Sequence, residues 1–372
     1  MADTANELFR DALLRRQIAL AHFERGLQTD IVRVLDETER DLRVAMADRL
    51  MAVEGKAFGT TTNSRLNVMA NALAKIRSSA FDEVSSMWDD SLEQLALDEA
   101  EFLDRNLKRV SPVMLDTLLP DPVMLAAIVS VEPMGGRVLS EWASTSQRAD
   151  LQRIMDAVRV GMTQGESTDD IIRRVVGSRD LNGTDGVLEI SRRDAAAITQ
   201  TAVSTVANSA RGEYYAANDD IFDTESWVAT LDSKTCEECG SLDGQQFPNG
   251  TGPKAPLHFN CRCTRVATIN GRAIGNRPAT SATEEALAGL TGKDRRARVQ
   301  EMTGQVPATT TYPEWLGRQS ESFQEHVLGT SRAALFRDGG LTLDKFVNRD
   351  GKTLNLDQLR TREPEAFERS GI

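Results

Sequence analysis

Apolar residues recur at steps of three and four positions along residues 1–111, the spacing that places side chains on one face of an α-helix. The first stripe consists of Leu20, Phe23, Leu27, Ile31, Leu35, Leu42, Met46 and Leu50. After a break rich in Gly, Thr and Asn at 54–64, the second stripe consists of Leu66, Met69, Leu73, Ile76, Phe81, Val84, Trp88, Leu92, Leu95, Phe102 and Leu107. Two stripes of this length predict a long antiparallel helical hairpin, or a coiled coil, over 1–111.

Prolines at 112, 120, 122 and 133 and the glycine pair 135–136 interrupt this pattern. We interpret residues 112–137 as a hinge or linker, because proline and glycine end regular elements. Helical periodicity returns at 138–163, in a short helix that Ser167 or Thr168 can cap, and at 190–217. The apolar face of 190–217 carries mostly small residues, which let a helix approach its neighbours closely. This helix is therefore expected at the centre of its domain.

The periodicity changes to alternation at 223–231 and 261–269, which predicts two short strands. They border a Cys/His module at 231–269, within a domain that we place at 138–270. Residues 271–372 are expected to form a connector and a helical tail, with one helix at 314–336. The predicted fold class is therefore mainly α with a small β/metal-binding module.

The charge balance limits what the protein binds. With 44 basic and 56 acidic residues, the formal net charge is -12, which repels a nucleic-acid backbone at long range. The one dense basic cluster, at 292–298, is interpreted as a solvated helix face. No stretch reaches the ~20 apolar residues of a membrane span, and no signal peptide begins the sequence. Synthesis in the cytoplasm is expected, with no membrane partner.

All four cysteines lie between 236 and 263. In a reducing compartment, such a cluster indicates a metal site or a catalytic site more than a disulfide framework. Cys236 and Cys239 form a C-x-x-C, and His258, Cys261 and Cys263 form an H-x-x-C-x-C. A structural zinc ion takes four thiolate or imidazole ligands, so five donors compete for four positions.

Residues two apart on an extended strand point to opposite faces, so Cys261 and Cys263 can share one metal only if the backbone turns between them. The preferred ligand set is Cys236 and Cys239 with two of His258, Cys261 and Cys263. The intervening loop is rich in turn formers, and a bound zinc ion would supply the order that it lacks. Two alternatives stay open: reduced thiols packed beside a hydrogen-bonded His258, or a disulfide formed in oxidising surroundings.

Catalysis by a metal would need an open coordination position and a nearby carboxylate. Glu237, Glu238 and Asp243 are the candidate carboxylates, whereas His22 and His326 stand alone on predicted helices. The zinc-deaminase order, H-x-E before P-C-x-x-C, is absent, as are the phosphate-binding and dinucleotide-binding glycine loops and the nucleophile elbow. The sequence therefore predicts a protein that is not an enzyme.

Three blocks occur in order: the helix AAAITQTAVSTVANSARGEYY, the module WVATLDSKTCEECGSLDGQQF with PLHFNCRC, and the region PEWLGRQSESFQEHVLGTSRAALFRDGGLTLDKFVNRDGKTLNLDQLR. Together they resemble the head morphogenesis family of tailed bacteriophages, minor head proteins of the phage Mu F-like type, over residues 140–372. The chain departs from the family pattern at two places. Lys234 and Thr235 stand where an arginine commonly precedes the first cysteine, and Gln200 stands where a charged residue is common.

The resemblance implies a non-enzymatic component of the virion, made in the host cytoplasm and located inside the phage head at the portal vertex. It implies a role in head assembly and in DNA retention or ejection. The portal protein is the implied partner, and scaffold, major capsid protein and packaged DNA are further candidates. The alternative hypothesis is a zinc-dependent enzyme or head-packaged effector acting on nucleic acid or protein, suggested by the surplus fifth ligand and the adjacent carboxylates.

Overall fold

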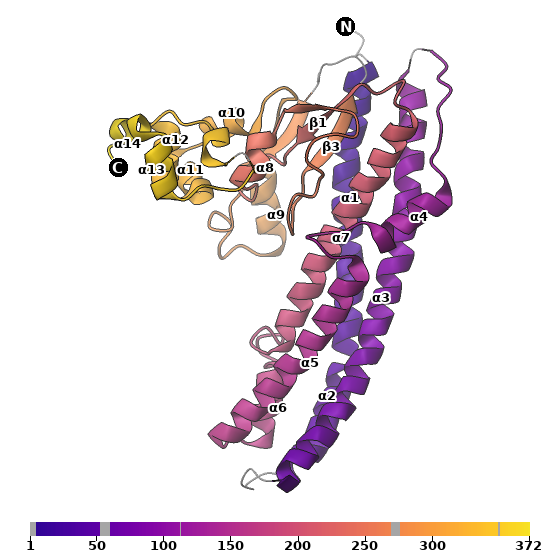
Figure 1. Ribbon diagram of the computed structural model, residues 1–372. Helices are drawn as coiled ribbons and strands as arrows, with labels where there is room; N and C mark the ends of the chain where they lie inside the picture. Colours follow the sequence, from indigo (N-terminus) through magenta and orange to yellow (C-terminus); the bar gives the residue numbers. More distant parts are fainter. Residues whose placement is uncertain (1–4, 53–59, 112, 269–275, 349) are drawn as a thin grey trace.

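The computed structural model describes residues 5–52, 60–111, 113–268, 276–348 and 350–372. A long helical bundle forms one part of the molecule, and a small β-containing module with a helical C-terminal region projects from one end of it (Figure 1). The predicted class, mainly α with a small β module, is confirmed. Within the described residues, no helix combines the length and the apolarity that crossing a membrane requires.

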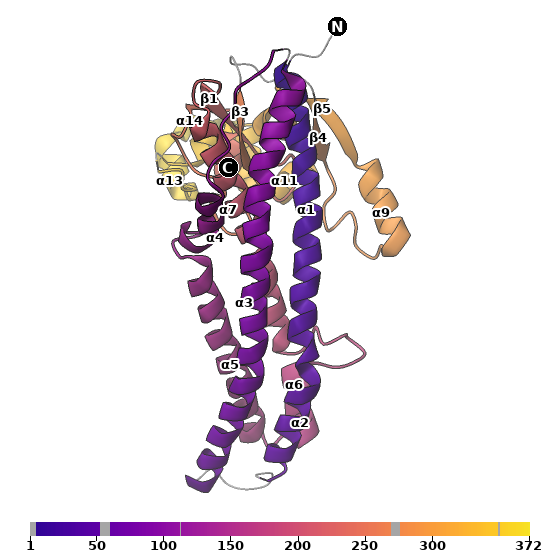
Figure 2. The ribbon, with the colours of Figure 1, turned by 90° about the vertical axis from the view of Figure 1, so that its right-hand side faces the viewer.

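Two helical arms form the N-terminal hairpin. The first arm is α1 (Ala5–Glu37) followed by α2 (Glu39–Leu50), and the second is α3 (Thr60–Val110). They lie side by side in both views (Figures 1 and 2). The predicted stripes are buried or half-buried except at Phe23, which is 37% exposed. The prediction is wrong there, because the buried stripe runs through Leu20, Leu27 and Ile31 and Phe23 lies at its edge. The predicted break at 54–64 falls on the first turn of α3 and on residues 54–59, which lie outside the described residues.

The first arm is interrupted at Thr38, between α1 and α2. Arg77 of α3 donates from Nη1 to the Leu35 carbonyl at 3.0 Å and to Thr38 Oγ1 at 2.7 Å. The same guanidinium makes two hydrogen bonds, of 2.7 and 3.0 Å, to the carboxylate of Asp150 in α5 (Leu139–Gln164). Both partners are buried. One buried ion pair therefore ties the two arms of the hairpin to α5.

The helices after the hairpin pack along it and complete one bundle. Ser167 caps α6 (Thr168–Val176) by accepting a hydrogen bond from the Asp170 backbone N–H. Helix α7 (Leu188–Ala217) packs on α1, α3 and α5, so its predicted central position is confirmed. Its buried face carries the small residues Ala195, Ala202, Ala207 and Ala210. Two apolar cores each combine residues of the hairpin with residues of the α5–α7 region.

The segment expected to be a hinge, 112–137, instead contains the helix α4 (Pro122–Val131). Asp121 caps this helix by accepting a hydrogen bond from the Val123 N–H at 2.8 Å, and Pro122 occupies its first turn, where proline needs no hydrogen-bond partner. The buried residues Leu125, Ile128 and Val129 belong to the core that α3 and α7 share. Proline starts a helix here because tertiary packing supplies an apolar surface for it.

The predicted strands at 223–231 and 261–269 are confirmed as β1 (Thr224–Val228) and β3 (Thr264–Thr268). They pair antiparallel, and β2 (Gln246–Pro248) completes a sheet in the order β2–β1–β3, with the short helix α8 (Glu237–Leu242) between β1 and β2. A second antiparallel pair, β4 (Asn276–Thr280) and β5 (Thr303–Pro307), carries α9 (Gly292–Glu301) between its strands. No residue of α9 is buried, as expected of a solvated basic helix.

The C-terminal region has an apolar core of its own, built mostly from residues after 311. Its elements are α10 (Tyr312–Gly317), α11 (Glu321–Leu328), α12 (Thr330–Arg337), the 3-10 helix η1 (Leu343–Phe346), α13 (Leu356–Arg362) and α14 (Pro364–Ser370). The single helix expected at 314–336 is therefore three helices. Ser320 caps α11, and Gly329 has a φ of 75° that interrupts helical geometry, so two local signals outweigh the continuous apolar pattern.

Candidate metal centre

The C-x-x-C segment is held by the start of α8. Cys236 is the N-cap residue of this helix, and its Sγ accepts a hydrogen bond from the Cys239 backbone N–H at 3.4 Å. Cys239 lies in the first turn and is buried. This turn points both sulfur atoms to the same side, which is the arrangement that lets a C-x-x-C bind one metal ion.

The second set of donors comes from the segment before β3. His258, Cys261 and Cys263 precede the strand, which begins only at Thr264, and Asn260 has a φ of 60°. The chain therefore turns here. The sulfur atoms of Cys239, Cys261 and Cys263 all lie within 4.8 Å of one another, so Cys261 and Cys263 reach the same side.

All five predicted donors gather around Cys239. One trio is Cys236, Cys239 and His258, the other is Cys239, Cys261 and Cys263, and the ligand atoms of each trio lie within 4.8 Å of one another. The Nε2 atom of His258 is 3.1 Å from Cys236 Sγ and 3.3 Å from Cys239 Sγ, and the sulfur atoms of Cys239 and Cys261 are 3.6 Å apart. A tetrahedral zinc ion with Zn–S bonds of ~2.3 Å spaces its sulfur ligands by about 3.8 Å. These separations therefore suit one zinc ion.

The protonation of the cluster also suits a cation. The hydrogen bond from Cys239 and the neighbouring His258 lower the pKa of the Cys236 thiol to about 4, and hydrogen bonds from Cys239 and Cys263 lower the pKa of Cys261. The hydrogen bond to Cys236 raises the pKa of His258 to about 9. These two thiols are thus ready to act as thiolates, whereas the neighbouring thiols raise the pKa of Cys239 and of Cys263, so a metal ion would have to displace the protons of these two thiols.

His258 is oriented by its other ring nitrogen. Nδ1 lies 2.7 Å from the carbonyl oxygen of Phe259, to which it can donate a hydrogen bond. That bond leaves Nε2, the atom facing Cys236 and Cys239, as the nitrogen that can bind a metal. Phe259 in turn packs edge-on against Trp142 of α5, with ring centroids 4.7 Å apart, and against Gly135. The segment predicted as a hinge therefore anchors the loop that carries His258.

The two alternatives for the cysteines, a disulfide and plain packing, can be compared with this geometry. All four are free thiols, and the 3.6 Å between the Cys239 and Cys261 sulfur atoms far exceeds the ~2.05 Å of a disulfide. Cys239, Cys261 and Cys263 do pack in a small core with Trp227 and Ala255. Plain packing, however, does not require five donors to converge. The donor set can hold a metal ion.

The three carboxylates considered for catalysis all contact the C-terminal region or its connector. Glu237 lies 3.5 Å from Arg332 of α12, and Glu238 accepts a hydrogen bond from the Thr353 N–H at 3.1 Å. Asp243 is buried and accepts hydrogen bonds from Ala229 N, Tyr312 N and Arg277 Nη1, at 2.8, 2.6 and 2.8 Å. These side chains join the module to the second strand pair and to the C-terminal helices.

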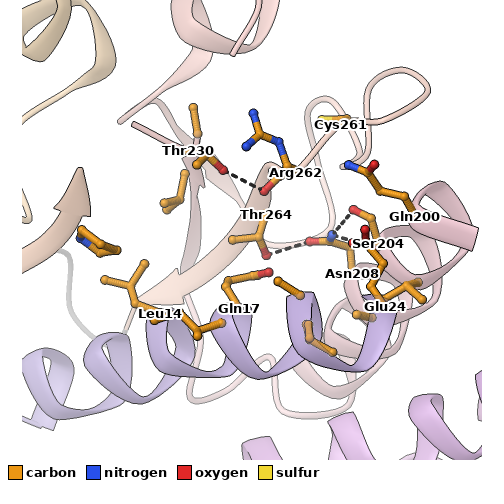
Figure 3. A pocket seen from close by; sticks show the side chains of 18 of the residues that line it. Leu14, Gln17, Glu24, Gln200, Ser204, Asn208, Thr230, Cys261, Arg262 and Thr264 are labelled. Atoms are coloured by element: carbon orange, nitrogen blue, oxygen red, sulfur yellow. Dashed lines mark hydrogen bonds between the residues drawn. The ribbon is translucent and has the colours of Figure 1, made fainter. Parts of the chain in front are cut away.

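A cavity of about 720 Å³ lies between α1, α7 and the module (Figure 3). Side chains from all three line it, among them Leu14, Gln17, Glu24, Gln200, Ser204, Asn208, Thr230, Cys261, Arg262 and Thr264. Many of these polar groups bind one another. Thr264, for example, donates to Asn208 Oδ1 at 2.8 Å, and Thr230 donates to the Arg262 carbonyl. Burial raises the pKa of Glu24, whose carboxylate accepts a hydrogen bond from Gln28.

The sequence interpretation missed this cavity, although signals for it exist. His22, Gln200 and Lys234 all line it. At Gln200 and Lys234, which are far apart in sequence, the chain departs from the pattern of the family that it resembles. His326 lies elsewhere, exposed on α11.

Comparison with known proteins gives one family. Residues 152–266 match the family described as Phage Mu protein F like protein. The match begins inside α5 and ends inside β3, so it includes all five donors and the central helix α7. No curated protein and no solved structure shows significant similarity to the chain.

Proposed function

We propose that this chain, whose residues 152–266 match the phage Mu protein F like family, is a minor head protein of a tailed phage. It acts as a non-enzymatic structural and interaction component inside the head, at the portal vertex. Its work is head assembly and the retention or ejection of DNA, and its partner is the portal protein. The family match across the Cys/His module is the observation that carries the proposal.

The architecture supports an interaction role. One arm of the bundle is a helix of 51 residues, whose outer face is available for contacts with partners. The carboxylates beside the cysteines bind Arg332, Thr353, Arg277 and backbone N–H groups, which leaves them in structural contacts. Those contacts count against the rival hypothesis of a zinc-dependent enzyme or head-packaged effector.

We further propose that zinc occupies the Cys/His cluster. Cys239 belongs to both trios, so it is a ligand in the set that we favour, with three of Cys236, His258, Cys261 and Cys263. The bound ion would tie α8 to the loop that leads into β3 and would act as a structural staple. Scaffold, major capsid protein and packaged DNA remain candidate contacts of the assembled protein.

The location is tested by counting copies of the chain in purified heads with quantitative mass spectrometry. Heads that contain the portal should carry a small, constant number of copies, and heads assembled without the portal should lack the chain. A normal copy number in heads without the portal would contradict the portal assignment.

The metal is tested by elemental mass spectrometry on the purified full chain. About one zinc per chain is expected, because a structural site of four ligands holds a single ion. Substitution by Co²⁺ then reports the number of thiolate ligands from its visible absorption in each single Cys→Ser variant and in His258→Ala. If the purified chain contains no metal and the variants are as stable as wild type, the cysteines are packed thiols and not a metal site.

The rival enzyme hypothesis is tested with Glu238→Gln, which keeps the size of the side chain but removes its charge. The structural interpretation expects phage yield to be close to wild type. Asp243 is a poor choice for this test, because its buried carboxylate binds Arg277 and its loss would disturb folding.

A further inference from the structure

Seven large apolar side chains are exposed within one short segment, on and just before α4. They are Val113, Met114, Leu118, Leu119, Val123, Met124 and Val131. Met114 is 100% exposed and Val123 is 77% exposed. In the rest of the described chain, exposed apolar residues of this size are spread over many elements. We call this surface the 113–131 apolar face; a concentration of this kind is typical of a protein interface.

The neighbouring helix α3 carries an uncompensated acidic strip. Between Arg77 and Arg105 the sequence contains no lysine or arginine. Its exposed acidic residues are Asp82, Glu83, Asp89, Asp90, Glu93, Asp98 and Glu101. Glu101 pairs with Arg105 at 3.0 Å, and no other member of the strip forms a salt bridge with a described residue. Partial desolvation and the nearby carboxylates of Glu93 and Asp90 raise the pKa of Asp89, which fits a strip that lacks a cationic partner.

The two surfaces lie on helices that pack against each other. The contacts between α3 and α4 are among the most extensive in the bundle, and Figure 2 shows both helices on the side turned toward the viewer. The inner face of α4, with Leu125, Ile128 and Val129, is already buried against the bundle. The outer face and the strip therefore present an apolar surface beside a band of negative charge.

We propose that the 113–131 apolar face docks an apolar segment of a partner protein, flanked by lysine or arginine residues that pair with the acidic strip of α3. The inference deepens the proposed function, on which it rests only for the identity of the partner, the portal protein. Apolar contact would supply affinity, and the charges would supply orientation and discrimination between partners.

The charges argue against other occupants. Nucleic acid would be repelled by the strip. A second copy docked through the same face would bring two acidic strips together. The exposed basic helix α9 of a second copy has charge but little apolar surface, since Ala297 and Val299 are its only apolar residues larger than glycine. A separate protein with both features is the occupant that fits.

The experiment uses two variants of the full chain, each with a control variant, supplied to phage that lack the gene. The apolar variant is Met114→Ser, Leu118→Ser, Val123→Ser and Met124→Ser. Its control removes four exposed but scattered apolar side chains, with Val44→Ser, Val68→Ser, Leu181→Ser and Ile190→Ser. The charge variant is Asp90→Lys with Glu93→Lys, and its control is Asp41→Lys with Asp48→Lys on α2. Helical circular dichroism and thermal unfolding verify that each variant is folded.

The first readout is the number of copies in purified heads. The apolar variant is expected to fall by roughly tenfold or more, because a few interface residues carry most of the binding energy, and the charge variant by less. Both controls should match wild type. Equal incorporation of the apolar variant and its control would overturn the proposal, as would a wild-type chain that self-associates through this face in sedimentation measurements.

A second readout separates this proposal from the proposed function. The affinity of each full-length chain for the purified portal protein is measured at two salt concentrations. Both proposals are supported if the wild-type chain binds the portal and the apolar variant does not. The binding should also weaken as the salt concentration rises, but only in chains whose acidic strip is intact. If the apolar variant is incorporated into heads less than its control, but the wild-type chain has no affinity for the portal, the portal is not the partner and the docking surface is retained. Portal binding by the apolar variant equal to that of its control would overturn the docking surface and keep the portal as partner.

Discussion

The helical bundle and the Cys/His module use different physics to hold their shapes. The bundle buries apolar residues from helices α1 to α7, and its interior includes the buried ion pair of Arg77 with Asp150. The module has a three-stranded sheet, one short helix and a small core in which Cys239, Cys261 and Cys263 pack with Trp227, Ala229 and Ala255. The bundle is held by burial. The sheet of the module also packs on the bundle through Val228, Val266 and Ala267, but we expect its cysteine-containing part to depend on the proposed zinc.

The largest effect is expected from removing the proposed zinc. Cys239→Ser removes the donor shared by both trios, and we expect the zinc and the order of residues 231–268 to be lost together. Metal binding in small structural sites contributes about 10–16 kcal/mol of apparent free energy, so the local effect exceeds any single apolar substitution. Hydrogen exchange of the module and far-ultraviolet circular dichroism provide the measurement. Ser241→Ala, in the same short helix α8, is the control.

The bundle should keep its helices in that experiment. A variant that lost both the zinc and the helical signal of α1, α3 and α7 would show that the two regions fold as one unit. The contrast between a burial-stabilised bundle and a metal-stabilised module would then be wrong.

The second prediction concerns the free energy of unfolding when the buried ion pair inside the bundle is broken. Arg77→Met leaves Asp150 buried without its cation and the Leu35 carbonyl without its donor, and should lower the free energy of unfolding by about 3–5 kcal/mol. Urea unfolding at neutral pH measures it. Arg105→Met breaks an exposed pair with Glu101 and should cost less than about 1 kcal/mol. Similar costs for the two variants would mean that the buried pair is not a principal tie.

The third effect falls on the junction between the two regions. Phe259→Ala removes the contacts with Trp142 and Gly135, and should cost about 2 kcal/mol, because Phe259 is only partly buried and full burial of a phenylalanine is worth about 3–5 kcal/mol. The proposed zinc should also dissociate faster, since the Phe259 ring holds the loop whose backbone carbonyl orients His258. The Leu257→Ala variant, exposed in the same loop, is the comparison. If the dissociation rate of zinc is unchanged, the contact of Phe259 with Trp142 does not affect metal binding.

The smallest effect is expected on α9. Arg296→Ala removes one charge from a helix with no buried residue, and the free energy of unfolding should change by no more than about 0.5 kcal/mol. Thermal unfolding of the full chain measures this. A larger loss would place α9 in a contact that the structure of the single chain does not contain.

The elements whose signals are local could be predicted from the sequence. The long hairpin, the central helix at 190–217 and the strands on either side of the cysteines follow from periodicity, since residues three, four or two apart share a face whatever surrounds them. The five donors were also visible, because metal chemistry needs particular residue types at short spacings. Phe23 is the exception within the stripes, as its exposure depends on which helix lies beside it.

The remaining features of the fold and of the site depend on contacts between segments that are distant in sequence. Asp121 and Pro122 are local start signals for the helix at 122–131, and packing against α3 and α7 stabilises it where the prolines indicated a hinge. Only the turn before β3 brings Cys261 and Cys263 to the same side. Glu238 and Asp243 bind groups as far as 115 and 69 residues away in sequence. The cavity is formed by α1, α7 and the module together. Contacts between distant segments depend on how whole elements pack, and no local spacing in a single sequence specifies that packing.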